Sequence, residues 1–279
     1  MTQVLIVGCG DLGGEVANQL TQLGIKTMGA RRSASSLNDS NVIQIDVTQP
    51  DSLESLQYIQ PQILIYCVAA NGQTDEQYKA HYVDGLKNVL ATQVANTKLQ
   101  HVFFVSSTRV YGQITNVLLD ESVEAIPADF GGERLLEAEN LLKTLSCGAT
   151  VLRLSGIYGT NRLRMINLAK SPKSWPSQNS WSNRIHRDDA AAFIVFLVRQ
   201  VFAVHQIQDC YIVTDSAPAS QHEVLTWIAN QMKQILPQQA LEPVSGGKRL
   251  SNQRLLATGF RLQYPDFKVG YQSILSSIQ

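Results

Sequence analysis

Short apolar runs alternate with segments whose apolar residues recur every three or four positions through the first half of the chain. The runs at residues 4–7, 62–70 and 101–107 are apolar on both faces, as is typical of strands buried in a parallel sheet. Shorter strand-like runs cover residues 25–30, 42–47 and 150–154, and helical spacing covers residues 16–23, 75–95 and 129–146. This alternation predicts an α/β fold with a doubly wound parallel sheet.

The pattern changes in the second half. Residues 160–183 are polar and predict a long loop, whose Trp175 and Trp181 either stack on a substrate ring or belong to a small lid. A helix with a long apolar face is predicted from Asp188 and is expected to pack back on the sheet. Another helix, residues 220–236, begins with Ser220 and Glu223 at capping-box spacing, and a third ends near Gly259.

The first strand runs directly into a Gly-x-Gly-x-x-Gly turn, and a helix follows the turn. Gly8 allows the tight turn, Gly10 lets the backbone approach a pyrophosphate, and Gly13 lets the helix pack close to the strand. The helix N-terminus then favours the bound anion. We therefore predict a dinucleotide-binding site whose contacts in this turn are Gly8, Gly10, Asp11, Leu12 and Gly13. The alternative is a glycine-rich turn without a ligand.

Two arginines follow the second strand, where this geometry brings the chain to the adenosine ribose. An Asp or Glu there would bind the ribose 2′-hydroxyl of NAD, whereas Arg31 and Arg32, with Ser33, suit a 2′-phosphate. NADP is therefore the predicted cofactor and NAD the alternative. The two arginines could instead form a solvated loop.

Further cofactor contacts are predicted at the ends of the next two strands. Asp46 could bind the adenine amino group or make a turn, and the sequence leaves both roles open. Val68, Ala69 and Ala70 leave room for the pyrophosphate and the nicotinamide ribose, although a plain tight turn fits them equally well.

Composition excludes several other classes of function. The 279 residues include 23 Lys plus Arg and 23 Asp plus Glu, so the net charge gives no case for binding nucleic acid or an anionic membrane. No apolar run approaches the roughly 18 residues of a membrane span, and no leader is recognisable, so a cytoplasmic location is expected. Cys9, Cys67, Cys147 and Cys210 are widely spaced, which predicts reduced, buried thiols and no metal site.

The segment Ser-Ser-Thr-Arg-Val-Tyr-Gly at residues 106–112 resembles the Ser-Ser-x-x-Val-Tyr-Gly segment of the extended short-chain dehydrogenase/reductases of the NAD-dependent epimerase/dehydratase type. Residues 153–159, 183–190 and 211–215 resemble later segments of that family in the same order, so the resemblance spans nearly the whole chain. It implies a nicotinamide dinucleotide cofactor and a substrate that is a nucleotide sugar or a related carbonyl or hydroxyl compound. It also aligns Ser107 with the active-site hydroxyl, and we place Ser106 beside it among the cofactor contacts.

Two departures from the family pattern matter. The glycine turn has Gly-x-Gly-x-x-Gly where typical members have Gly-x-x-Gly-x-x-Gly. The Tyr-x-x-x-Lys pair is replaced by Phe130 and Arg134. Phe130 has no proton to transfer, while Arg134 can still hold a ribose or a phosphate, so we predict it as a cofactor contact. The resemblance is therefore to an atypical subgroup of nucleoside-diphosphate-sugar epimerase-like or reductase-like proteins.

Any proton relay must then use another group besides Ser107. We take Tyr111 as the second catalytic candidate and consider Tyr158 and His186 as well. The competing interpretation is that the two tyrosines are packing residues with tethered hydroxyls and that His186 orients the loop before a helix.

Two domains are expected. Residues 1–154 form the dinucleotide-binding domain, residues 187–214 return to its sheet, and residues 155–186 with 215–279 form a small substrate-side region. There, Lys248 and Arg249 either contact an anionic substrate or lie in a solvated turn. The leading function is an NAD(P)-dependent oxidoreductase or epimerase. A catalytically silent NADP-binding sensor is the alternative, and a purely structural protein is the third possibility. The oligomeric state is left open.

Overall fold

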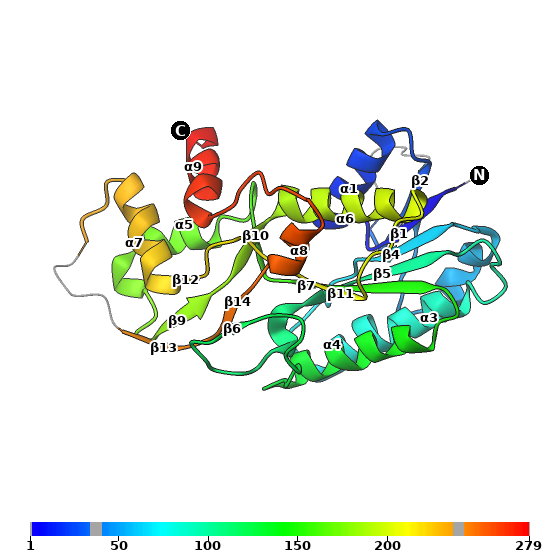
Figure 1. Ribbon diagram of the computed structural model, residues 1–279, viewed down its shortest axis with the longest axis horizontal. Coiled ribbons are helices and arrows are strands. Elements are labelled where there is room, and N and C mark those ends of the chain that lie inside the picture. Colours follow the sequence, from blue (N-terminus) through cyan, green and yellow to red (C-terminus); the bar gives the residue numbers. More distant parts are fainter. Residues whose placement is uncertain (1, 34–40, 237–242, 279) are drawn as a thin grey trace. The chain divides into compact units, whose positions relative to one another are not determined.

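The computed structural model describes residues 2–33, 41–236 and 243–278 (Figure 1). The chain divides into two compact units. The first comprises Met1–Gly112, Ala125–Arg153 and Ala190–Tyr211, and the second comprises Gln113–Glu124, Leu154–Asp189 and Ile212–Gln279.

The first unit is built on a seven-stranded sheet with the strand order β11-β7-β5-β4-β1-β2-β3. The pairs formed by the first five strands are all parallel. The helices α1 and α6 lie on one face of the sheet and α3 and α4 on the other (Figure 1). The predicted doubly wound Rossmann-type α/β fold is confirmed. The strands are β1 (Val4–Val7), β2 (Thr27–Arg31), β3 (Val42–Gln44), β4 (Ile63–Tyr66), β5 (His101–Ser107), β7 (Gly148–Leu154) and β11 (Cys210–Val213).

The helices of this unit follow the predicted periodicity, with one interruption. They are α1 (Asp11–Gln22), η1 (Pro50–Tyr58), α2 (Asp75–Tyr78), η2 (Lys79–Asp84), α3 (Gly85–Ala91), η3 (Thr108–Val110), α4 (Phe130–Leu141), η4 (Leu142–Thr144) and most of α6 (Arg187–Phe202). The predicted single helix at residues 75–95 is thus wrong in detail, because η2 is a π-helical turn that separates α2 from α3.

A buried tyrosine accounts for the π-helical turn. The hydroxyl of Tyr66, at the end of β4, donates to the carbonyl of His81, which a regular α-helix would pair with the N–H of Gly85. A side chain at Gly85 would place its Cβ 2.6 Å from the Tyr66 hydroxyl oxygen, so glycine leaves room for the phenol. His81 is itself buried, with Nδ1 2.8 Å from the carbonyl oxygen of Gln77, which agrees with a structural role.

The second unit is built from short strands, four α-helices and one 3-10 helix in its described part. These elements are β6 (Leu118–Leu119), β8 (Gly156–Tyr158), α5 (Arg164–Ala169), η5 (Pro172–Ser174), β9 (Asn179–Ser182), β10 (Arg184–His186), β12 (Ala219–Ser220), α7 (Gln221–Gln231), β13 (Val244–Gly246), β14 (Arg249–Leu250), α8 (Gln253–Ala257) and α9 (Phe267–Ser277). The sequence did not indicate α9. As predicted, Ser220 caps α7, and its hydroxyl accepts from the N–H of Glu223 at 3.1 Å.

The prediction of a long loop at residues 160–183 is wrong. The segment contains α5, η5 and β9, because its few apolar side chains are used in the core: Ile166 and Ala169 are fully buried. Trp175 is half-buried, and its indole N–H donates to the carbonyl of Leu168 at 3.1 Å, so it packs against the segment it follows.

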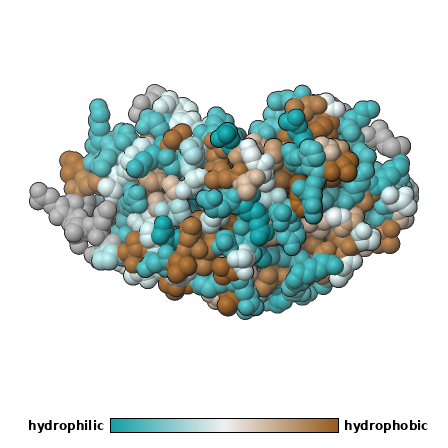
Figure 2. Space-filling model, viewed as in Figure 1, coloured by the Kyte–Doolittle hydropathy of each residue, from teal (hydrophilic) through white to brown (hydrophobic). Residues whose placement is uncertain are grey.

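Hydrophilic and hydrophobic residues are interspersed over the face shown in Figure 2. No helix of the described ranges is long and apolar enough to cross a membrane. All four cysteines lie in the described ranges, and none of them forms a disulfide. Cys9 is buried as predicted, whereas Cys67, Cys147 and Cys210 are half-buried, which corrects the expectation for these three.

The second unit contains a buried polar cluster around Asp215, which is 1% exposed. One carboxylate oxygen of Asp215 accepts from the N–H of Ala217 at 3.2 Å. Its other oxygen, the hydroxyl of Tyr158 and one terminal nitrogen of Arg184 are buried without hydrogen-bond partners among the described residues. Burial raises the pKa of Asp215 to about 7, although the charge of Arg184 acts in the opposite direction.

This raised pKa predicts that the Asp215 contribution to stability falls as the pH rises. Its pKa in the unfolded chain is about 3.9, so between pH 4 and pH 7 the native state binds the proton more tightly. The free energy of unfolding should therefore decrease over this range and level off above it. Asp215→Asn keeps the acceptor for Ala217 and should raise the melting temperature at pH 8 while changing it little at pH 4. Equal pH dependence of the two proteins in thermal denaturation would contradict this assignment.

Candidate functional site

The turn between β1 and α1 is fixed by contacts of two of its glycines. Gly8 has φ of 95°, and a Cβ there would lie 2.6 Å from the backbone nitrogen of Val68 and even closer to the carbonyl group of Cys67. A Cβ at Gly13 would collide with the carbonyl oxygen of Gly8 and lie 3.2 Å from a methyl group of Ile6. These contacts confirm the predicted tight turn at Gly8 and the close helix–strand packing at Gly13.

Gly10 differs from these two residues. It is exposed, and a Cβ there would meet no atom of the described chain within 4 Å. Gly10 is also the N-cap of α1, and no side chain caps that helix. The backbone at Asp11 and Leu12 therefore begins a helix without a capping side chain, next to an open position. This is the arrangement that an anion such as a pyrophosphate requires.

Arg31 ends β2, the strand next to β1. Its Nε is buried and has no hydrogen-bond partner within the described ranges, so it retains a donor for a ligand. Arg32 is exposed, as is Ser33, the last residue before the undescribed segment 34–40. The two guanidinium groups are thus placed at the end of β2, as a ribose 2′-phosphate would require.

Asp46 is engaged in turn formation. Its Oδ1 accepts from the N–H of Thr48 at 3.0 Å and from the Thr48 hydroxyl at 2.7 Å. Burial by itself would raise the pKa of Asp46, but these hydrogen bonds and the charge of Arg32 hold it below the ordinary value. The turn also explains why β3 ends at Gln44, before the predicted position 47. The adenine contact of Asp46 stays a prediction.

The strand predicted at residues 62–70 ends at Tyr66, and the chain beyond it has no regular structure. Val68 and Ala70 are half-buried and Ala69 is exposed. The N–H of Ala70 donates to the hydroxyl of Tyr82, which fixes the end of this segment. The predicted contacts of Val68, Ala69 and Ala70 with a cofactor remain open to test.

Ser106 belongs to a buried ionic network. Its hydroxyl donates to Glu139 of α4 at 2.6 Å, and Glu139 also accepts from Arg153 of β7, with a shortest distance of 2.6 Å. A second nitrogen of Arg153 donates to the hydroxyl of Tyr111 at 2.6 Å. The network ties β5, α4 and β7 together. Because the Ser106 proton is used here, the geometry favours a structural role for Ser106 over the predicted cofactor contact.

Tyr111 shows the tethered arrangement that we raised as the alternative to catalysis. It is fully buried, and the Arg153 guanidinium lies 4.9 Å from its ring centroid. Its predicted catalytic role stays a prediction that this geometry does not favour. Ser107, by contrast, is half-buried at the end of β5. Its oxygen accepts from the N–H of Arg109 at 3.2 Å, and its proton has no acceptor within the described part of the chain.

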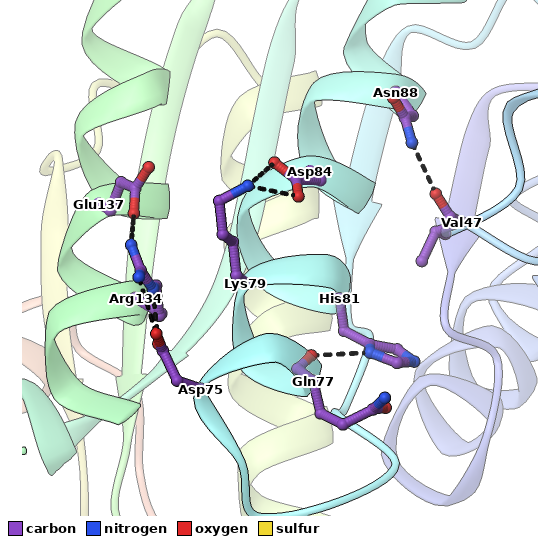
Figure 3. Close-up of polar contacts among 9 residues, drawn as sticks. All are labelled: Val47, Asp75, Gln77, Lys79, His81, Asp84, Asn88, Arg134 and Glu137. Atoms are coloured by element: carbon purple, nitrogen blue, oxygen red, sulfur yellow. Dashed lines mark hydrogen bonds and ion pairs between the residues drawn. The ribbon is translucent and has the colours of Figure 1, made fainter. Parts of the chain in front are cut away.

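Arg134 is held by two carboxylates. It donates to both oxygens of Asp75, at 2.7 and 2.9 Å, and to Glu137 at 2.8 Å (Figure 3). The hydrogen bonds from Arg134, together with its charge, hold the pKa of Asp75 below its ordinary value. These contacts join α4 to α2. The guanidinium therefore has a structural role in this arrangement, and its predicted cofactor contact is not supported by the geometry.

A cluster of side chains around Arg109 was not predicted from the sequence. Its Nε donates to Asp129 at 2.9 Å, and its Nη1 donates to the hydroxyl of Tyr78 at 2.7 Å and to the side-chain oxygen of Gln73 at 3.1 Å. The guanidinium lies directly against Gly131, where a Cβ would be 2.6 Å from two of its nitrogens. The available signal was Arg109 itself, inside the segment that carried the family resemblance.

Phe130 packs into the same cluster. Its ring meets the ring of Tyr78 edge to face, with centroids 5.5 Å apart, and the Arg109 guanidinium carbon lies 5.2 Å from its centroid. The residue that replaces the family tyrosine is thus part of an aromatic wall around a cation.

His186, Trp181 and Arg249 lie in the second unit, and their side chains contact other residues of that unit. The N–H of Asp188 donates to Nδ1 of His186, as expected for a residue that orients the start of a helix. The indole of Trp181 donates to Asn116 at 2.7 Å, and the Arg249 guanidinium lies 5.0 Å from its ring centroid. Trp181 therefore stacks on a cation of its own unit.

Comparison with solved structures shows the same fold in several proteins. A protein from Methylobacillus flagellatus, described as an NAD-dependent epimerase/dehydratase, is 47% identical, with 99% of this chain and 98% of that chain covered and a TM-score of 0.91. UDP-glucose 4-epimerase from Thermus thermophilus, solved with NAD, is 16% identical, with 96% of each chain covered and a TM-score of 0.76. WbmG from Bordetella bronchiseptica, solved with NAD and UDP, is 15% identical, with 98% and 94% covered and a TM-score of 0.78.

Comparison by sequence gives the family. No curated protein matches the chain significantly. Residues 1–261 match the family model of the RmlD substrate binding domain. The chain therefore belongs to the RmlD substrate binding domain family, and its assignment to the atypical extended short-chain dehydrogenase/reductases of the epimerase/dehydratase type is confirmed.

Proposed function

We propose that this protein is an NAD(P)-dependent oxidoreductase or epimerase that acts on a nucleotide sugar. The observation that carries the proposal is the open, uncapped N-terminus of α1 at Gly10, beside two glycines whose conformations are fixed by contacts within the chain. The turn thus fits a dinucleotide pyrophosphate. The solved relatives that hold NAD, and the one that also holds UDP, support the cofactor and substrate classes.

Ser107 is the group that we assign to the reacting oxygen. A bound nicotinamide supplies the hydride or accepts it. The Ser107 oxygen is held by the N–H of Arg109, which leaves its proton to hydrogen-bond a substrate oxygen. This bond strengthens as negative charge develops on that oxygen, so it lowers the barrier for hydride transfer.

A silent NADP-binding sensor is the second candidate. It is favoured by Phe130, which has no hydroxyl, and by Arg134, whose guanidinium is engaged by Asp75 and Glu137. Both candidates bind the cofactor, so they are separated by turnover.

Within this proposal NADP is the preferred cofactor, because the buried Nε of Arg31 retains its donor. Arg31→Ala should weaken NADPH binding by about 10- to 100-fold, as expected for the loss of a charge-assisted hydrogen bond. It should leave NADH binding nearly unchanged. Isothermal titration calorimetry with both dinucleotides measures this difference. Equal affinities of the unmodified protein for NADPH and NADH, unaltered by the substitution, would remove the argument for a 2′-phosphate site.

Turnover tests the enzymatic proposal itself. The protein, supplied with NADP or NAD, should convert at least one of UDP-glucose, UDP-galactose and dTDP-glucose, followed by chromatography of the sugar nucleotides. Ser107→Ala should lower kcat by roughly 10²- to 10³-fold, the usual effect of losing one donor to a developing oxyanion. Ser107→Thr should restore part of it, and cofactor affinity should be unchanged in both variants. Cofactor binding without conversion of any of the three sugars would favour the sensor.

A further inference from the structure

In the first unit, the side-chain amide oxygen of Gln73 accepts hydrogen bonds from two strong donors, Tyr78 and Arg109. The side-chain oxygen of Gln73 accepts from the hydroxyl of Tyr78 at 3.1 Å and from Nη1 of Arg109 at 3.1 Å. The same Arg109 nitrogen donates to the Tyr78 hydroxyl at 2.7 Å. A phenol and a guanidinium thus converge on one carbonyl-type oxygen. This is the geometry of a site that stabilises negative charge on an oxygen.

The two donors are rigidly held, whereas the acceptor is not. Arg109 is fixed by Asp129, by Gly131 beneath it, and by the rings of Tyr78 and Phe130, which lie 5.0 and 5.2 Å from its guanidinium carbon. The side chain of Tyr78 is buried, with 7% of the residue exposed. Gln73 is exposed and lies before α2, in a segment without regular structure. Its oxygen can therefore be displaced by another one.

The π-helical turn lies directly after Tyr78. Such turns are energetically poorer than a regular helix and are found frequently at functional sites. Here the turn is imposed by the Tyr66 hydroxyl on the carbonyl of His81, with Gly85 leaving the space. Tyr78 lies immediately before the turn and Tyr82 lies within it, and their ring centroids are 5.2 Å apart. The fold thus accepts an irregular helix at the point where Tyr78 meets Arg109.

We propose that Tyr78 and Arg109 bind the reacting oxygen of the substrate together with Ser107, and that Tyr78 transfers the proton that Phe130 cannot supply. The amide oxygen of Gln73 stands in for the substrate oxygen. This proposal rests on the proposed function, because it names the group that completes its chemistry.

Tyr78 supplies one proton when a substrate carbonyl is reduced. A bound reduced nicotinamide supplies the hydride. As the new C–H bond forms, the π electrons of the carbonyl move to oxygen, the O–H bond of Tyr78 breaks, and its proton forms the alcohol O–H bond. The phenolate left on Tyr78 is stabilised by the adjacent Arg109 guanidinium and recovers a proton from water. Oxidation of an alcohol runs through the same groups in reverse.

Tyr82 is the rival for this role. Its hydroxyl accepts from the N–H of Ala70, and burial raises the pKa of Tyr82, although this hydrogen bond and the charge of Arg109 act in the opposite direction. It has no hydrogen bond to a cation within the described ranges, whereas Tyr78 has one to Arg109. The hydrogen bond from Arg109 places a positive charge directly at the Tyr78 oxygen, the atom on which proton transfer leaves negative charge.

Paired substitutions separate the two tyrosines. Tyr78→Phe removes only the hydroxyl and should lower kcat by roughly 10²- to 10⁴-fold, the range of general acid–base catalysis, without changing cofactor affinity. Tyr82→Phe, the same change one turn further along the helix, should cause a much smaller loss. Both are measured on the sugar nucleotide that the unmodified protein converts. An equal or larger loss in Tyr82→Phe, or little loss in Tyr78→Phe, would overturn the proposal.

A readout independent of turnover uses fluorine NMR of protein labelled with 3-fluorotyrosine, in which the Tyr78 signal is assigned by its absence in Tyr78→Phe. Saturating NADP should shift this signal. The adenosine fragment 2′-phospho-ADP-ribose, which lacks the nicotinamide, should leave it in place. An unshifted Tyr78 signal with bound NADP would overturn this inference alone. Absence of any binding would instead contradict the proposed function and this inference with it.

Discussion

The first unit depends on a backbone contact that only glycine permits. The helix α1 starts so close to β1 that Gly13 lies against the carbonyl oxygen of Gly8, and Gly8 in turn lies against the backbone of Cys67, the residue that follows β4. Two strands and one helix are thereby held at a fixed distance. The remaining glycine of the turn, Gly10, faces open space at a helix N-terminus that no side chain caps. The packing contacts of Gly8 and Gly13 thus leave Gly10 open, which is why we propose the pyrophosphate site at this helix N-terminus.

The polar residues in and around the segments that resemble the family divide into two groups by their contacts. Glu139 and Arg153 form a buried pair that holds Ser106 and Tyr111, and Arg134 joins α4 to Asp75. These groups fix the positions of β5 and α4. Ser107 lies at the end of β5, which this network holds, and its hydroxyl proton has no acceptor in the described part of the chain. Arg109 lies two residues further along and donates to the Tyr78 hydroxyl and to the side-chain oxygen of Gln73. Phe130 and Arg134 replace the family tyrosine and lysine, but the first unit still contains two donors in fixed positions, the Tyr78 hydroxyl and the Arg109 guanidinium.

The sequence was sufficient for the parts of the fold that depend on local pattern. The β1–α1 turn, the alternation of strands and helices in the first half of the chain, and the cap at Ser220 follow from residue types at fixed spacing. The π-helical turn could not be predicted, because its cause, Tyr66, lies 15 positions from the carbonyl it binds. The Arg109 cluster was missed for the same reason: its partners Tyr78 and Gln73 lie 31 and 36 positions away. The segment at residues 160–183 was misjudged because its polar composition concealed the few residues that are buried.

The central claim is that Gly10 is a glycine because of a ligand, whereas Gly8 and Gly13 are glycines because of the fold. Gly14 provides a matched control, since a Cβ there also meets nothing within 4 Å. The deciding measurement is the affinity of Gly10→Ala and Gly14→Ala for NADPH by isothermal titration calorimetry, with folding verified by circular dichroism. The account predicts that both variants fold, that Gly14→Ala binds like the unmodified protein, and that Gly10→Ala loses most of its affinity. Unchanged binding by Gly10→Ala would contradict it.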